Sequence, residues 1–268
     1  MIAGFFESAE HCLLLSDPGE KCAAVTELWE RLEASSLSWD HDFPVKPIPV
    51  PGRPPRPLLV EPSRVPRRRL GSTHGRAALV HAIAHIEFNA INLALDAAYR
   101  FRGMPVSFYH DWLSVAADEV RHFILLEKRL LELGSGYGEL PAHNGLWEMA
   151  VKTADSCLVR MALVPRVLEA RGLDVTPAMI ERLKAVGDDE TVAALDVILA
   201  EEVRHVAVGT EWFRFCCERE GREPLPTFLD LLKRHYPSAP KGPYNLDARY
   251  EAGFTREEMR ALTAGFSA

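Results

Sequence analysis

Two five-residue stretches of this sequence nearly repeat each other: Asp118-Glu119-Val120-Arg121-His122 and Glu201-Glu202-Val203-Arg204-His205. Each contains Glu-x-x-His in a segment without the apolar–polar alternation that is typical of a strand. Residues three positions apart share one face of a helix, so the carboxylate and the imidazole of each stretch can reach the same metal ion. The two stretches therefore predict an all-α fold that carries metal ligands on two of its helices.

A lone glutamate precedes each stretch at nearly the same distance along the chain: Glu87 before Glu119, and Glu169 before Glu202. The same two-helix unit therefore occurs twice. Packed around a pseudo-twofold axis, the two units would direct four carboxylates and two imidazoles at one point, the ligand set of dinuclear iron bundles. The predicted metal ligands are Glu87, Glu119, His122, Glu169, Glu202 and His205.

The apolar neighbours of these residues predict that the ligands are buried. Four ionised carboxylates cannot be buried together without compensating charge, which two metal cations would supply. Carboxylate and imidazole donors without thiolate suit iron or manganese and argue against a structural zinc site. A single Glu-x-x-His is common by chance, whereas a matched pair with matched preceding glutamates is far more specific. We expect two iron ions, with manganese or a mixed iron–manganese pair as alternatives.

Composition shifts divide the chain into four expected segments. Residues 1–43 are predicted to be helical, with a helix start at Asp17-Pro18-Gly19-Glu20. Residues 44–71 are rich in proline, which predicts an extended arm, either laid along the body or mobile. Residues 72–220 form the expected four-helix bundle, and residues 221–268 a C-terminal helical tail packed on it, with a capping box at its last helix. The expected bundle helices are 75–102, 109–133 (ending at Gly134, a suitable left-handed cap), 145–171 (ending at Gly172) and 190–219, with a short extra helix from Thr176-Pro177 to about Val186.

The connections predict the topology of this bundle. The first and second helices are close in sequence, as are the third and fourth, so each pair is expected to be antiparallel. The loop 135–144 can extend about 35 Å at about 3.5 Å per residue, which is the length of a bundle helix. One long crossover between two antiparallel pairs is the ferritin-like arrangement.

The span from Arg76 to Glu218 resembles the ferritin-like superfamily. The stretches His81–Glu87 and Val164–Asp174, together with the two Glu-Val-Arg-His motifs, are similar to a bacterial ferritin-like family of unknown function. The resemblance implies the bundle and the metal site, with all six ligand positions filled. By analogy Glu119 and Glu202 would bridge the metals, and the other four ligands would be terminal. The resemblance implies no substrate.

Length and composition limit the classes of protein to which this chain can belong. The 268 residues are 47% hydrophobic and carry a net charge of −7. This suits one globular domain with appended segments and argues against general nucleic-acid binding. No long uncharged apolar run and no basic N-terminal region occur, which argues against a membrane span and a signal peptide. The odd number of cysteines and the absence of CxxC spacing favour the reducing cytoplasm.

A polar stripe precedes and follows Glu87 on the first bundle helix: His81, His85, Asn89, Asn92 and Asp96. We interpret it as a hydrogen-bonding seam in preference to a second metal site. Pro165, four residues before Glu169, is expected to distort the third bundle helix beside the site.

Three functions fit these predictions. The leading one is a di-iron oxidase or oxygenase that uses dioxygen and a small organic substrate, because the segments outside the bundle can build a pocket. The second is a ferroxidase or iron-storage ferritin, and the third a non-catalytic interaction module stabilised by metal. No membrane or nucleic-acid partner is expected, and a homodimer is compatible with the sequence.

Overall fold

The computed structural model describes residues 4–65, 69–236 and 242–265. Within these residues every regular element is a helix, and the only β-type pairing is an isolated bridge between Leu59 and Ala142. The predicted all-α class is confirmed. The chain forms two compact units, residues 1–151 and 152–268, which are described in turn.

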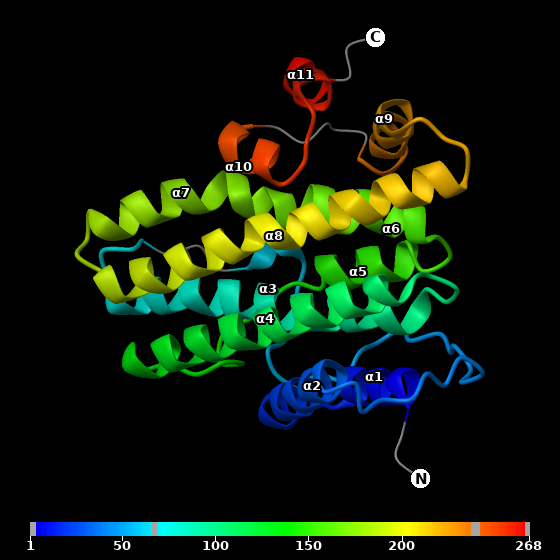
Figure 1. Cartoon of the computed structure of the whole chain (residues 1–268). Coiled ribbons are helices and arrows are strands. Elements are labelled where there is room, and N and C mark those ends of the chain that lie inside the picture. The colour runs from blue at the N-terminus through cyan, green and yellow to red at the C-terminus, as the bar shows by residue number, and fades with distance from the viewer. Residues whose placement is uncertain (1–3, 66–68, 237–241, 266–268) are drawn as a thin grey trace. The chain divides into compact units, whose positions relative to one another are not determined.

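The first unit is built around two long helices, α3 and α4, which pack against each other (Figure 1). The shorter α1 packs on α3, and α2 packs on α4. Asp17 caps α2 by accepting a hydrogen bond from the Glu20 N–H at 2.9 Å, and Gly134 follows α4 with a φ of 73°, both as the sequence predicts. The helices of this unit are α1 (Phe5–Leu14), α2 (Pro18–Glu33), η1 (Pro62–Arg64), α3 (Thr73–Arg100), α4 (Val106–Glu132) and α5 (Gly145–Lys152).

Helix α3 alone, among the described helices, is long and apolar enough to cross a membrane. Its most apolar window is 78% buried. A buried core helix has the same length and composition as a membrane span, so this property reflects its central place in the first unit.

The described part of the proline-rich arm lies along the first unit. Gly52 N donates to Leu13 O at 2.9 Å, and Trp147 Nε1 donates to Pro49 O at 3.0 Å. These bonds anchor the arm to α1 and α5. Proline leaves few backbone donors for regular structure, so the arm is held through bonds to neighbouring elements.

The loop 135–144 is fixed on α3. The Tyr137 hydroxyl lies 2.9 Å from His85 Nδ1, and Gly138 N donates to His81 Nε2 at 3.0 Å. Further along α3, Asn92 Oδ1 accepts from a buried lysine of α2. The polar stripe of α3 is thus a hydrogen-bonded seam, as the sequence analysis favours.

In the second unit, α6, the π-helical turn η2 and α7 follow one another along α8 (Figure 1). Helices α9 and α10 also pack on α8, and α11 packs on α9. The helices are α6 (Cys157–Leu163), η2 (Val164–Glu169), α7 (Ala170–Lys184), α8 (Asp189–Arg219), α9 (Pro224–His235), α10 (Leu246–Glu251) and α11 (Arg256–Ala264).

The prediction of one continuous helix over 145–171 is wrong. Helix α5 ends at Lys152, and α6 begins anew after Ser156. The Ser156 hydroxyl accepts a hydrogen bond from Val159 N at 3.2 Å and so caps α6. A serine cap offers the backbone an alternative to continuing the preceding helix.

The predicted stop at Gly172 and the separate helix 176–186 are also wrong, because α7 runs through both Gly172 and Pro177. A proline inside a helix deprives the carbonyl four residues earlier of its partner, here Leu173 O. Asn245 Nδ2 donates to that carbonyl at 3.3 Å. A residue of the tail therefore compensates for the proline, which local sequence cannot reveal.

Candidate metal centre

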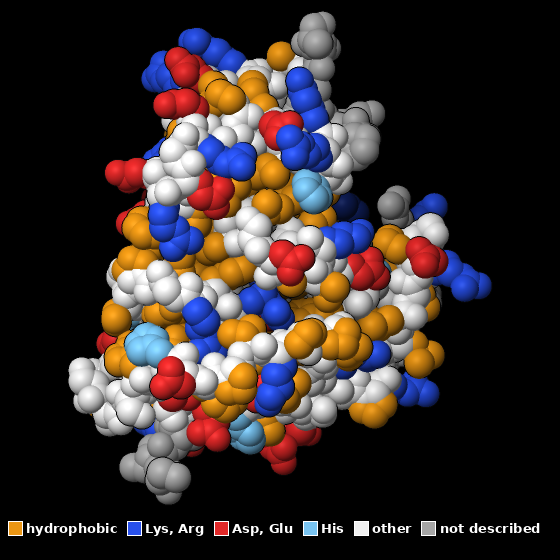
Figure 2. All heavy atoms as spheres, turned by 90° about the vertical axis from the view of Figure 1, so that its right-hand side faces the viewer, with side chains coloured by type: hydrophobic (Ala, Val, Ile, Leu, Met, Phe, Trp, Pro, Cys, Tyr) orange, Lys and Arg blue, Asp and Glu red, His pale blue; other side chains and the backbone are white. Residues whose placement is uncertain are grey.

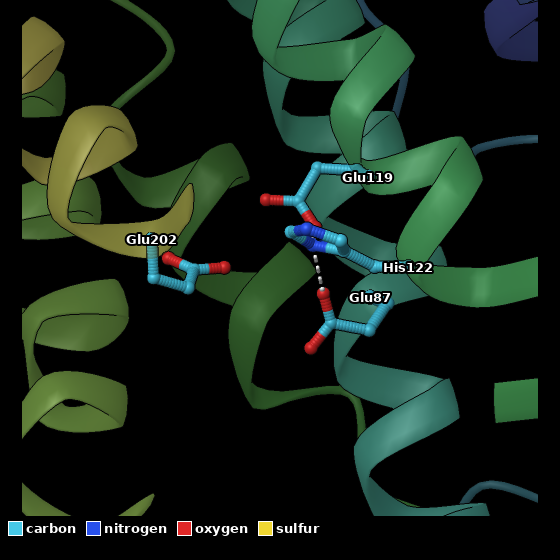
Figure 3. Close-up of side chains that lie close together, drawn as sticks. All are labelled: Glu87, Glu119, His122 and Glu202. Carbon is cyan, nitrogen blue, oxygen red and sulfur yellow. Dashed lines mark hydrogen bonds and ion pairs between the residues drawn. The ribbon is translucent and has the colours of Figure 1, made fainter. Parts of the chain in front are cut away.

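Three of the predicted ligands come together in the first unit (Figure 3). Glu87 lies on α3, and Glu119 and His122 share one face of α4. His122 Nδ1 lies 3.1 Å from Glu87 Oε2 and 3.3 Å from Glu119 Oε2. One ligand atom from each residue lies within 4.8 Å of the others, which is close enough for all three to reach one ion. We call these residues the first triad.

The first triad is buried, with exposed fractions of 3% for Glu87, 0% for Glu119 and 1% for His122. Burial and the neighbouring charge of Glu119 raise the pKa of Glu87 well above its usual range. Burial opposes a charge on His122, but hydrogen bonds to Glu119 and Glu87 outweigh it and raise the pKa of His122 to about 11. Protons therefore offset carboxylate charge within the triad, and a metal cation in the same place would do the same.

The other three predicted ligands lie in the second unit, and we call them the second triad. On α8, His205 Nδ1 lies 3.6 Å from Glu202 Oε1. His205 is fully buried, while the Glu202 side chain is 13% exposed. Glu202 is also drawn in Figure 3. Glu169 ends η2, which packs along α8. Among the described residues of this unit alone, no three ligand atoms gather as closely as in the first triad.

The turn that carries Glu169 is π-helical. Ala170 N donates to Pro165 O, five residues earlier, in place of the usual four. Pro165 lacks an N–H, so it breaks the α-helical ladder at this point, as the sequence predicts. The wider turn changes the direction of its own last residue, Glu169, relative to a regular α-helix.

One residue that the sequence analysis missed is Gly209, one helical turn after His205. It permits α8 and Pro165 to approach too closely for any side chain. A glycine inside a long helix costs stability, so its presence there was a signal of close backbone packing.

Comparison with known protein families places this chain in one of them. Residues 14–260 match a family described as "Protein of unknown function (DUF455)". The chain belongs to this family. An uncharacterized protein of Haemophilus influenzae is 44% identical over 269 residues, which cover 97% of this chain and 93% of that protein. No solved structure matches.

The match confirms the predicted membership of a family of unknown function. Membership of the wider ferritin-like superfamily stays a prediction. Because neither the family nor the relative carries a stated activity, the chemistry has to be argued from the triads.

The donors of the first triad fit a metal ion. Two carboxylates and one imidazole are the ligands that iron and manganese prefer. All five cysteines are free thiols, and none belongs to the group of ligand atoms. The first triad is thus a buried carboxylate and histidine cluster that can hold a metal ion.

Figure 2 shows one face of the molecule. Basic and acidic side chains of the described residues are interspersed there with hydrophobic ones.

Proposed function

We propose that this protein is a dinuclear metal protein, with two iron ions as its cofactor. The buried cluster of Glu87, Glu119 and His122 carries the proposal. The second Glu-x-x-His, Glu202 and His205, supports it because it repeats the first motif with its own preceding glutamate, Glu169. The fold we propose for it is a ferritin-like four-helix bundle in which each unit contributes one helix pair and one triad.

The proposed ligand set balances charge. Two carboxylates from each triad supply four negative charges, which two divalent cations neutralise. Glu87, Glu119, Glu169 and Glu202 would hold the two ions together with His122 and His205. The apolar surroundings keep water away and strengthen each interaction between ligand and ion.

Within this proposal the protein is an oxidase or oxygenase of a small organic substrate. A bound iron pair would supply the redox chemistry for dioxygen. The chain's own residues would hold the ions and exclude water. Iron storage in a cage is the weaker alternative, because the protein's own α1 and α2 cover α3 and α4. A cage needs such helix faces for contacts between subunits.

Elemental analysis of protein purified from iron-replete cells tests the metal site. We expect about two iron ions, or one iron and one manganese, per chain, and strong loss in both Glu119→Ala and Glu202→Ala. The matched controls are the preceding residues, Asp118→Ala and Glu201→Ala, which leave the ligands in place. Equal metal in all variants overturns the site. Loss in Glu119→Ala alone leaves a mononuclear site and overturns the dinuclear one.

Oxygen uptake tests the reaction separately. The reduced, iron-loaded protein is expected to consume dioxygen, whereas Glu119→Ala is not. Stable ferrous protein in air overturns the oxygenase proposal and leaves the metal-stabilised module. Elution as a large shell in size-exclusion chromatography favours iron storage.

A further inference from the structure

A groove in the first unit runs between α2 and α4. Its volume is about 460 Å³, which lies within the range of about 300–1,000 Å³ that is usual for small-molecule sites. Along α2 the lining extends from Pro18 to Glu30, which corresponds to a length of about 18 Å at about 1.5 Å per residue. On α4 the lining residues are Phe123, Ile124 and Glu127. The groove therefore suits a guest that is long and narrow.

Most of the groove lining is apolar. Phe123 is buried, whereas Ile124 beside it is 50% exposed. A guest that removes this isoleucine from water gains hydrophobic free energy. The large and small apolar residues of the lining are Pro18, Cys22, Ala23, Phe123 and Ile124.

The charged residues of the lining are all acidic. Glu27, Glu30 and Glu127 line the groove, and no described lysine or arginine does. Arg31 and Lys128 each directly follow one of these glutamates, but the side chains of consecutive helical residues do not face each other. Arg31 lines a neighbouring groove between α1 and α2, which Glu27 also lines. Glu30 and Glu127 are therefore the carboxylates that favour a cationic guest most clearly.

Glu127 is half-buried on the α4 side of the groove. Burial raises the pKa of this carboxyl, and the charge of Asp17 raises it further. A carboxylate in such surroundings lacks part of the water that normally stabilises its charge. A positive group in the groove would supply this stabilisation and would keep Glu127 ionised.

We propose that this groove binds a linear aliphatic polyamine of the spermidine type. The ammonium groups bind the carboxylates of Glu127 and Glu30, and the methylene segments between them lie on the apolar lining. An inorganic cation makes no use of the apolar lining, and an uncharged apolar guest leaves the carboxylates without a partner. An α-helix of a basic partner, about 10 Å wide with its side chains, needs more volume than the groove offers. The site does not depend on the proposed metal centre.

Calorimetric titration of the full-length protein tests the proposal. Spermidine is compared with hexylammonium, with inert hexaamminecobalt(III) and with trilysine, at neutral pH and constant ionic strength. We expect one saturable spermidine site per chain, and binding about tenfold weaker for hexylammonium, which has a single charge. Equally tight binding of hexylammonium, or of hexaamminecobalt(III), which has the charge of spermidine without its methylenes, overturns the proposal. Tighter binding of trilysine, a peptide of the same net charge, overturns the polyamine in favour of a basic protein segment.

Substitutions separate the groove from the general acidity of the protein. Glu127→Gln and Glu30→Gln keep the shape of the groove and should each weaken spermidine binding about three- to tenfold. Glu20→Gln, at an exposed position of α2 outside the lining, removes the same charge and should leave the affinity unchanged. Ala23→Trp fills the groove without changing its charge and should abolish binding. Unchanged affinity in Glu127→Gln or in Ala23→Trp overturns the proposal.

Methyl NMR of the wild-type protein locates the polyamine without any substitution. Spermidine should shift the methyl signals of Ile124 and leave those of Ile86, a similarly exposed isoleucine of α3, in place. If calorimetry detects binding but the Ile124 signals do not move, the polyamine binds elsewhere and the proposal is overturned.

Discussion

Gly209 of α8 and Pro165 of η2 lie in backbone-to-ring contact. A Cβ placed on Gly209 would lie 2.2 Å from both Cβ and Cγ of Pro165. Gly209 follows His205 by one turn, and Pro165 precedes Glu169 by about one turn. This contact therefore sets how closely α8 and η2 approach beside the second triad.

Gly209→Ala should destabilise the protein. Overpacking costs about 1–3 kcal/mol, and the better helix propensity of alanine returns about 1 kcal/mol. We expect a net loss of up to about 2 kcal/mol in the free energy of unfolding, measured by denaturant titration. If the proposed metal site is correct, metal content should fall as well.

Gly172→Ala is the matched control. Gly172 lies inside α7, and a Cβ there would meet nothing within 4 Å. Alanine should therefore stabilise the protein by about 0.5–1 kcal/mol. Equal stabilisation by both substitutions would show that the Gly209–Pro165 contact is unimportant.

Local sequence was sufficient for much of the fold and for the first triad. Asp17 and Gly134 mark helix ends through their own side chain or backbone, and both predictions are confirmed. The face shared by Glu119 and His122 follows from helical periodicity, and the structure brings Glu87 to the same place. That all six ligands surround one site stays a prediction.

Other features depended on distant contacts and could not be predicted. Helix α7 passes Pro177 because Asn245, far along the chain, bonds the carbonyl that the proline leaves exposed. The close approach at Gly209 depends on where Pro165 lies in space. The break before Ser156 is the exception, since a serine cap was visible in the sequence.

The buried pair of Arg166 and Glu258 is expected to hold the tail in place. Glu258 Oε2 accepts from Thr255 N at 2.8 Å and completes the predicted capping box, while Oε1 accepts from Arg166. Glu258→Gln keeps a capping acceptor but removes the charge that balances Arg166. Breaking a buried ion pair costs about 3–5 kcal/mol, so denaturant unfolding should show a loss of that order.

The exposed pair of Lys184 and Glu181 is the comparison for this loss. Glu181→Gln should change stability by less than about 0.5 kcal/mol, because solvent screens surface ion pairs. A similarly small effect of Glu258→Gln would mean that the buried pair does not secure the tail.

Lys21 is a fully buried amine in the first unit. Its Nζ donates to Cys12 O at 2.8 Å, to Leu13 O at 2.9 Å and to Asn92 Oδ1 at 2.8 Å. Burial lowers the pKa of Lys21 from its ordinary 10.5 to about 7. The unfolded chain therefore holds a proton between pH 7 and 10.5 that the folded chain has released.

The contribution of Lys21 to stability should accordingly rise with pH across this window, because at this group the unfolded state binds more protons than the folded state. Below pH 7 both states are protonated and the cost of burying the charge is fully present. The unfolding free energy of the wild type, measured relative to that of Lys21→Met, should therefore rise by the order of a few kcal/mol from pH 7 to 10. The unfolding free energy of the wild type relative to Lys128→Met, a change at an exposed position of α4, should show no such rise. A flat difference for Lys21→Met would mean that this amine stays protonated.

Metal binding at the first triad should release protons. The raised pKa values of Glu87 and His122 mean that the triad holds protons at neutral pH, and a metal ion must displace them. Metal affinity should therefore increase as the pH rises. Calorimetric titration with Mn²⁺ in two buffers of different ionisation enthalpy should give different heats, corresponding to about one or more protons per ion. His122→Asn should release fewer protons, while Asp118→Ala should match the wild type. Identical heats in both buffers would show that no proton leaves and that the ion binds elsewhere.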